Sequence, residues 1–191
     1  MRISPLIVLV SLSWVAPSLQ AGDTRTVEIE SCQFSITIPK DWAVEQTDWD
    51  FGTSADCSVG LRPPSWVDAA ARSEMDVSKY AIYVGTRKGD PRVNCEYFVC
   101  REGTAWYVEG RAGARWPAQE SHTSHWTKIR GVSEVGAYRK GGGYLSSAQA
   151  FVALLFKDGR VLEVIADREF QDEATFDSIV DSVCFNRSQN K

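Results

Sequence analysis

The sequence contains few of the residues from which active sites are built. Of its 191 residues only two are histidines, His122 and His125. The segment 131–136 has four residues between its glycines, whereas the nucleophile elbow of a serine hydrolase, G-x-S-x-G, has three. The triple glycine at 141–143 is not followed by the Lys and Ser or Thr of a phosphate-binding loop. We therefore expect a protein that is not an enzyme and that needs no cofactor.

The two histidines leave one catalytic alternative open. His122 and His125 are three residues apart, and Glu120 could supply a third metal ligand. A zinc or copper site at the usual spacing needs a further nitrogen or thiolate donor, so we expect no metal here. A small hydrolase or metalloprotein that uses this histidine pair is the rival hypothesis. A ligand-binding domain of the cell envelope, recognisable by an apolar cavity, is a third.

Basic residues are also scarce relative to acidic ones. The chain has 21 Lys and Arg against 25 Asp and Glu, which gives a formal net charge of −4. Nucleic acids and anionic lipid surfaces are bound through clustered basic side chains, so neither is expected as a partner. After the first residues the longest apolar candidate is the segment 151–156, which has the length of a strand. We expect no insertion into a membrane.

The beginning of the chain has the pattern of a secretory signal peptide. Arg2 supplies a positive charge, residues 6–15 form a short apolar run, and small residues follow at Ala16, Ser18 and Ala21. The run is too short to span a bilayer. The pattern predicts that residues 1–21 are removed and that the mature protein begins between residues 19 and 22. Residues 22–191 are then expected to form a single globular domain, periplasmic or secreted.

Cysteine is present in an odd number. The five cysteines are Cys32, Cys57, Cys95, Cys100 and Cys184. The cysteines of exported proteins usually form disulfides, because the compartment is oxidising. Five cysteines cannot all pair within one chain, so at least one is left over. Cys32 and Cys57 each begin a strand pattern, and neighbouring strands bring Cα atoms within the distance that a disulfide requires. We predict a Cys32–Cys57 disulfide and at least one other that involves Cys95 or Cys100.

The apolar pattern predicts mostly strands. Strands are expected within residues 26–38, near Val44, and over 57–61, 80–86, 105–111, 134–138, 149–156 and 161–167, with a polar loop before and through His125. Asp-Gly at 158–159, between two apolar runs, predicts a hairpin. Helices are expected after Pro63-Pro64, over 90–103, and at the end of the chain, where residues 176, 179, 180 and 183 form an apolar stripe. The class is α+β, a mainly antiparallel sheet packed by a few helices.

Two segments resemble a known superfamily. The sequence FSITIPKDW at 34–42, a strand followed by Pro and an Asp-Trp turn, looks like the opening of Mog1/PsbP-like domains. The Asp-Gly hairpin and the sequence FDSIVDSVCF at 176–185 are similar to their closing strand pair and helix. The resemblance implies an α/β/α sandwich around an antiparallel sheet. It also implies a domain that binds protein partners without performing chemistry.

Aromatic and basic side chains in polar segments form the candidate binding site. Trp, Tyr and Arg are enriched at the hot spots of interfaces, and loops carry binding residues more often than scaffold elements do. The candidate residues are Trp49, Arg115, Trp116, His122, His125, Trp126 and Arg130. The alternative is that each tryptophan covers an end of the sheet. We expect an exported, non-enzymatic protein that binds a protein partner, one form of which is a periplasmic immunity or accessory protein.

Overall fold

A computed structural model describes residues 23–47, 57–73, 77–87, 99–109, 113–123 and 125–186. The predicted signal peptide and Trp49 lie outside these ranges. Within them, none of the helices combines the length and the apolar character that crossing a bilayer would need.

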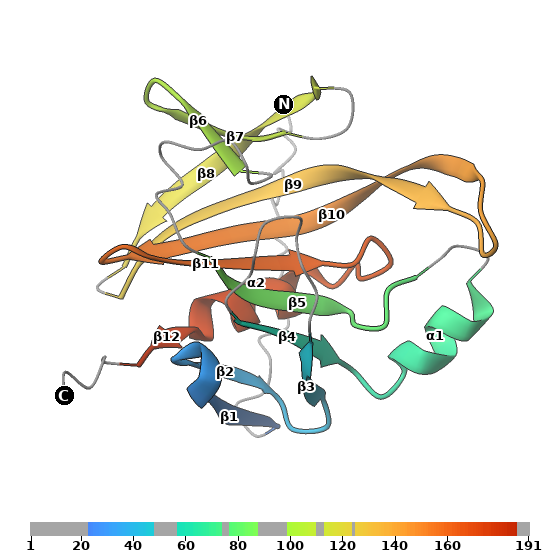
Figure 1. The fold of residues 1–191 in the computed structure, drawn as a ribbon, viewed down its shortest axis with the longest axis horizontal. Helices are drawn as coiled ribbons and strands as arrows, with labels where there is room; N and C mark the ends of the chain where they lie inside the picture. Colours follow the sequence, from blue (N-terminus) through green and yellow to red (C-terminus); the bar gives the residue numbers. More distant parts are fainter. Residues whose placement is uncertain are drawn as a thin grey trace, which may run out of the picture.

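The fold is built almost entirely from antiparallel strands (Figure 1). In chain order the elements are β1 (Thr24–Ile29), η1 (Glu30–Cys32), β2 (Phe34–Pro39), β3 (Ala43–Thr47), β4 (Cys57–Arg62), α1 (Trp66–Arg72), β5 (Ile82–Arg87), β6 (Val99–Glu102), β7 (Ala105–Glu109), β8 (Arg115–His122), β9 (Thr127–Tyr138), β10 (Tyr144–Lys157), β11 (Arg160–Ala166), α2 (Glu173–Ser182) and β12 (Cys184–Phe185). The larger sheet has nine strands in the order β3-β4-β5-β11-β10-β9-β8-β7-β6, and the smaller has three in the order β1-β2-β12. The predicted α+β class is confirmed.

The centre of the larger sheet is the hairpin formed by β10 and β11. Lys157 pairs with Arg160, so the turn consists of two residues, Asp158 and Gly159. Their φ angles are 51° and 77°, both in the left-handed region. That geometry matches the twist of the flanking strands and favours Asp-Gly, because glycine adopts a positive φ without strain. The hairpin predicted at 158–159 is confirmed.

Apolar side chains of the central strands point alternately to the two faces of the sheet, and each face carries a core. On β10, Ala153 and Leu155 belong to the main core, whereas Val152 and Leu154 belong to a second core on the opposite face. The main core is closed by α2, whose Phe176 ring packs 5.6 Å from the Phe151 ring. The second core is closed by residues of β6 and β7, so in the described part of the chain strands cover this face.

Helix α2 begins where the sequence supplies a cap. The side chain of Asp172 accepts a hydrogen bond from the backbone N–H of Thr175, 3.0 Å away. Such a cap satisfies one of the N–H groups that the first turn of a helix leaves unpaired. The predicted stripe residues Phe176, Ile179 and Val180 are buried. The predicted C-terminal helix is confirmed.

The smaller sheet joins the first described strands to the last ones. Strand β2 pairs with β1 on one side and with β12 on the other, where Cys184 lies opposite Ser35. Beside it, the backbone N–H of Thr37 donates a hydrogen bond of 2.9 Å to Ser182 Oγ at the end of α2. These contacts join residues that are 145 positions apart in the sequence.

Two disulfide predictions are confirmed. Cys32 and Cys57 are bonded, with a Cα–Cα distance of 5.3 Å, and the bond links η1 to the start of β4. Cys100 is also disulfide-bonded. Cys184 is a free, exposed thiol.

Strands β6 and β8 correct two predictions. Residues 99–102 of the predicted helix over 90–103 form β6, and Gly103, with a φ of 59°, is the β6–β7 turn instead of a helix end. The predicted polar loop before His125 contains β8, which pairs with β7 over residues 115–118 and with β9 over 119–122. Each half of β8 is therefore paired on one side only. Pro117 has no N–H to donate, and it is tolerated because the other side of the strand is unpaired at that position. Most of its side chains are exposed, so it lacks the apolar alternation that reveals a strand.

The change of partner along β8 lets β7 fold across β9 at Gly131. A Cβ atom placed on Gly131 would overlap Val108 Cγ2 of β7 and lie 3.4 Å from Ala118 Cβ. We expect Gly131→Val to lower the free energy of unfolding by about 1–3 kcal/mol, the usual cost of overpacking. Urea denaturation would measure it. Gln119→Val, on an exposed position of the adjoining strand, should change stability by less than about 0.5 kcal/mol. Equal stability of the two variants would contradict this packing.

Candidate functional site

Two surfaces stand out, at opposite ends of the long axis of the molecule (Figure 1). The first, here called the hairpin surface, consists of Val67, Tyr138 and Tyr144, at the tip of the β9–β10 hairpin and on α1. The second, here called the strand-end pocket, is lined by His125, Lys157, Asp158, Arg160, Cys184, Phe185 and Asn186.

The two tyrosines of the hairpin surface are held in place by the hairpin itself. Tyr138 on β9 and Tyr144 on β10 are paired across the ladder, and their rings meet edge to face with centroids 5.9 Å apart. The Tyr138 ring lies over Gly136, where a Cβ atom would be 2.9 Å from the ring. Glycine at 136 therefore leaves room for the ring to lie back along the strand. The turn between the tyrosines, Gly141 to Gly143, has positive φ at all three glycines.

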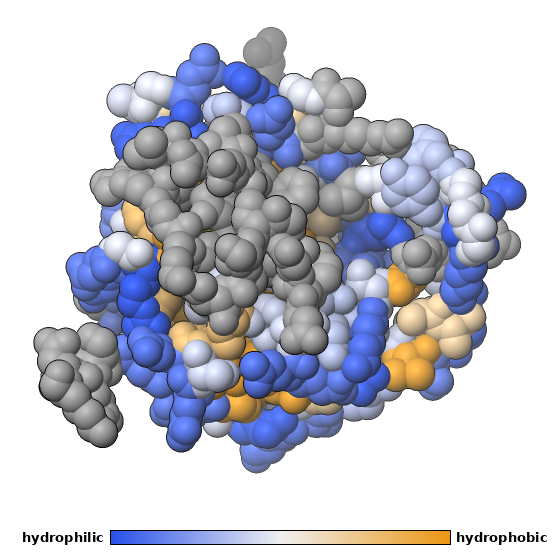
Figure 2. Space-filling view, viewed as in Figure 1, coloured by the Kyte–Doolittle hydropathy of each residue, from blue (hydrophilic) through white to orange (hydrophobic). Residues whose placement is uncertain are grey.

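A lysine attaches this hairpin to α1. Lys140 Nζ donates hydrogen bonds to the carbonyl oxygens of Ala70, at 2.8 Å, and Ala71, at 3.0 Å, in the last turn of the helix. A cation is favoured at this end of a helix, because the last carbonyls have no partner within the helix. The contact places Val67, one turn earlier on α1, at the same end of the molecule as the tyrosines. Figure 2 shows hydrophobic surface over α1 on this side.

The hairpin surface is exposed. The exposed fractions of Val67, Tyr138 and Tyr144 are 53%, 45% and 49%, and they are the exposed large hydrophobic residues among those whose side chains the structure describes. Tyr138 and Tyr144 were not among the candidate binding residues, although they stand on either side of the triple glycine at 141–143. The sequence carries a signal for them, because three consecutive glycines favour a turn and an aromatic residue stands near each side of it.

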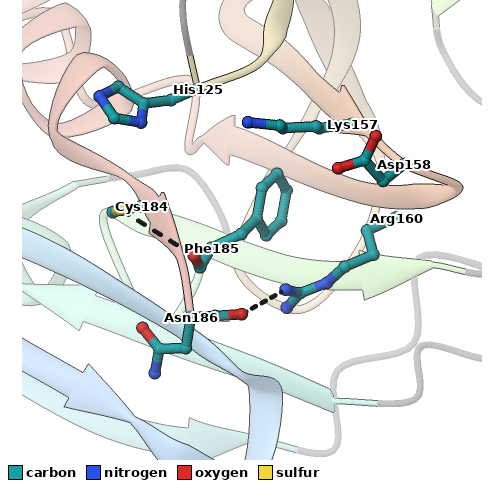
Figure 3. Close-up of a pocket in the computed structure, with 7 residues that line it drawn as sticks. All are labelled: His125, Lys157, Asp158, Arg160, Cys184, Phe185 and Asn186. Carbon is teal, nitrogen blue, oxygen red and sulfur yellow. Dashed lines mark hydrogen bonds between the residues drawn. The ribbon is translucent and has the colours of Figure 1, made fainter. Parts of the chain in front are cut away.

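The strand-end pocket lies where three segments of the chain meet (Figure 3). His125 comes from the β8–β9 loop, Lys157, Asp158 and Arg160 from the β10–β11 hairpin, and the remaining residues from β12 and its end. The Arg160 guanidinium lies 4.5 Å from the centroid of the Phe185 ring. Partial burial lowers the pKa of Arg160 below its ordinary value.

Two of the predicted site residues are structural, which corrects their assignment. Trp126 is only 5% exposed and packs in the main core. The Arg130 side chain, 13% exposed, donates to Asp177 at 2.6 Å and to Glu173 at 3.2 Å, and so ties β9 to α2. The Trp126 ring is part of the packed core, and the Arg130 guanidinium forms ion pairs between β9 and α2.

The remaining predicted residues that the structure describes do not converge on one face. Arg115 and Trp116 are neighbours on β8 and so point to opposite faces of the strand. Arg115 is exposed and forms an ion pair of 2.8 Å with Glu102, whereas Trp116 is half-buried. His122 lies 3.2 Å from Glu120 at the other end of β8. Only His125 lines the strand-end pocket.

The two histidines have different neighbours in the described part of the chain. His122 contacts Glu120 and Thr127, whereas the His125 ring packs against the Trp126 ring with centroids 5.8 Å apart. Among the described residues, no group of three His, Cys, Asp or Glu side chains is placed to hold a metal ion.

Comparisons with known proteins give a likeness of fold. No family model and no curated protein matches the sequence. Among solved structures, the chain is similar to the solution structure of cyanobacterial PsbP (CyanoP) from Synechocystis sp. PCC 6803. The TM-score is 0.46 and the sequence identity 8%, over 90% of this chain and 98% of that one. This likeness concerns the fold alone.

Proposed function

We propose that this chain is an exported, non-enzymatic binding protein that holds a protein partner on the hairpin surface. The observation that supports the proposal is that, among the side chains that the structure describes, the exposed large hydrophobic ones all belong to this one end of the molecule. Exposed apolar side chains are ordinary when they are scattered. Their gathering at the tip of a long hairpin is typical of a surface that is covered by another molecule.

The chemistry of the surface favours a protein as the partner. Tyrosine is among the residues most enriched at hot spots, since its ring supplies a large apolar area and its hydroxyl a hydrogen bond. Tyr138 and Tyr144 already rest against each other, and Lys140 fixes the hairpin to α1. Binding then orders few side chains that were free before, which favours affinity.

The compartment is the second part of the proposal. Disulfides persist in oxidising surroundings outside the cytosol, and the Cys32–Cys57 disulfide is consistent with such a location. The signal-peptide pattern of residues 1–21 favours the same route. Within this setting we propose a periplasmic protein, in the specific form of an immunity or accessory protein that occupies a surface of its partner.

A paired substitution at the hairpin tests the proposal. Immobilised mature protein would be used to capture a partner from an extract of the cell envelope, and the affinity of that partner would then be measured. We expect Tyr138→Ser with Tyr144→Ser to weaken binding by about 2–4 kcal/mol, as the loss of two hot-spot residues does. The fold should persist, because a cross-strand aromatic pair contributes only about 0.2–1 kcal/mol to stability.

Two controls make the result specific. Tyr138→Phe with Tyr144→Phe keeps both rings and should retain most of the affinity. Tyr107→Ser removes a half-buried tyrosine on β7, away from the hairpin, and should leave binding unchanged. Full binding by the Tyr138→Ser and Tyr144→Ser protein would contradict the proposal.

A further inference from the structure

The strand-end pocket has the size of a small-molecule site and lies away from the hairpin surface. Its volume is about 410 Å³, within the range of about 300–1,000 Å³ that is usual for ligand pockets. It is formed by side chains from the β8–β9 loop, the β10–β11 hairpin and β12, which are held together by backbone pairing. A pocket assembled from paired strands is largely formed before any ligand arrives.

The pocket contains a cation whose charge is not neutralised by a carboxylate of the described residues. Arg160 donates hydrogen bonds to the carbonyl oxygens of Gln33 and Asn186, the latter at 3.0 Å, and these acceptors are uncharged. Asp158 lines the same pocket, but the ion pairs of the described residues do not join it to Arg160. A half-buried guanidinium that lacks an ion pair retains a strong attraction for an anion.

Next to this cation the pocket is apolar. The half-buried Phe185 ring packs against the main core and lies over the Arg160 guanidinium. Figure 3 shows the Phe185 ring between Arg160 and Lys157, with the ammonium of Lys157 extended toward His125. An occupant would therefore meet an aromatic face and basic groups at the same time.

We propose that the strand-end pocket binds a small organic anion, one that carries a carboxylate beside an apolar group. The carboxylate takes the positive side formed by Arg160 and Lys157, where the His125 ring can add a hydrogen bond, and the apolar group contacts the Phe185 ring. Such a carboxylate occurs on a free small molecule and at the C-terminal end of a peptide.

A titration of the mature protein with matched probes tests the proposal. The probes are 3-phenylpropionate, its uncharged amide, and N-acetyl-Ala-Phe with a free C-terminal carboxylate. NMR shifts of the backbone amides of His125, Phe185 and Asn186 would report binding. We expect a carboxylate to bind at least about tenfold more tightly than the amide, since hydrogen bonds to a charged group are about twice as strong as neutral ones. Tighter binding of the acetylated dipeptide assigns the site to peptide ends, and tighter binding of phenylpropionate to free acids.

A charge-matched pair of variants checks the location. Lys157→Gln, at an exposed position of the pocket, should weaken the carboxylate probe by about fivefold or more. Lys79→Gln makes the same change of charge at an exposed lysine that pairs with Glu45, outside the pocket, and should leave binding unchanged. The thiol of Cys184 gives an independent reading, because it lines the pocket and is free. Its alkylation by iodoacetate, relative to that by the neutral iodoacetamide, should fall in Lys157→Gln.

Two results would overturn the proposal. One is equal affinity for the acid and the amide, which would show that the basic groups do not select the ligand. The other is that no probe gives saturable shifts at concentrations up to about 10 mM. A Kd above that concentration corresponds to a binding free energy weaker than about −3 kcal/mol.

Discussion

Trp126→Ala is expected to lower the free energy of unfolding by about 3–5 kcal/mol and to leave partner binding at the hairpin surface unchanged. The indole is almost fully buried in the main core, and its removal would leave a cavity there. Because small domains are stable by only about 5–15 kcal/mol, this loss is a large part of the whole. Chemical denaturation would measure it, and binding would be compared at a temperature where both proteins are folded.

A conservative change at the same position provides the control. Trp126→Phe keeps most of the apolar volume and removes an indole N–H that has no hydrogen-bond partner among the described residues. The variant should lose only about 1–2 kcal/mol. If Trp126→Ala instead weakened partner binding without a change in stability, Trp126 would be a contact residue and the assignment made from the structure would be wrong.

Removal of the Cys32–Cys57 disulfide is expected to have an effect of similar size. The bond closes a loop of 25 residues, and in the chain-entropy model such a loop is worth roughly 3 kcal/mol. We expect Cys32→Ala with Cys57→Ala to lower stability by that amount and the melting temperature by roughly 6–12 °C. Differential scanning calorimetry of the oxidised proteins would measure both.

The free cysteine supplies a matched control for this experiment. Cys184→Ala changes an exposed thiol that is not part of a disulfide, so stability should change by less than about 0.5 kcal/mol. An unchanged melting temperature of the double variant would show that the disulfide does not constrain the unfolded chain.

Sequence patterns succeeded where the structure is decided locally. The turn at Asp158-Gly159 depends on two adjacent residues, and α2 depends on a cap and an apolar stripe within one segment. The same kind of evidence failed at Gly103, because a glycine with positive φ can end a helix or close a hairpin. Gly103 closes a hairpin because β6 pairs with β7, and the residues before Gly103 do not by themselves indicate that pairing.

The candidate site was only partly predictable, for a related reason. Trp126 follows a polar run, so its neighbours in sequence suggest an exposed loop, whereas its neighbours in space are core residues from several elements. Arg130 was expected to face a partner, but its acidic partners lie on α2, more than forty residues away. Residues 138 and 144 flank a predictable turn, yet their exposure depends on where α1 docks, which the sequence does not state.

The pairing of β2 with β12, and the hydrogen bond from Thr37 to Ser182, carry a consequence for folding kinetics. These contacts join residues at least 145 positions apart, so a very large loop must close before they form. Proteins dominated by such distant pairings fold in milliseconds to seconds. The chain first loses the entropy of closing a large loop, and only then gains the favourable contacts. The smaller sheet cannot be completed until residues 173–185 have been made, so a chain under synthesis stays open for a long time.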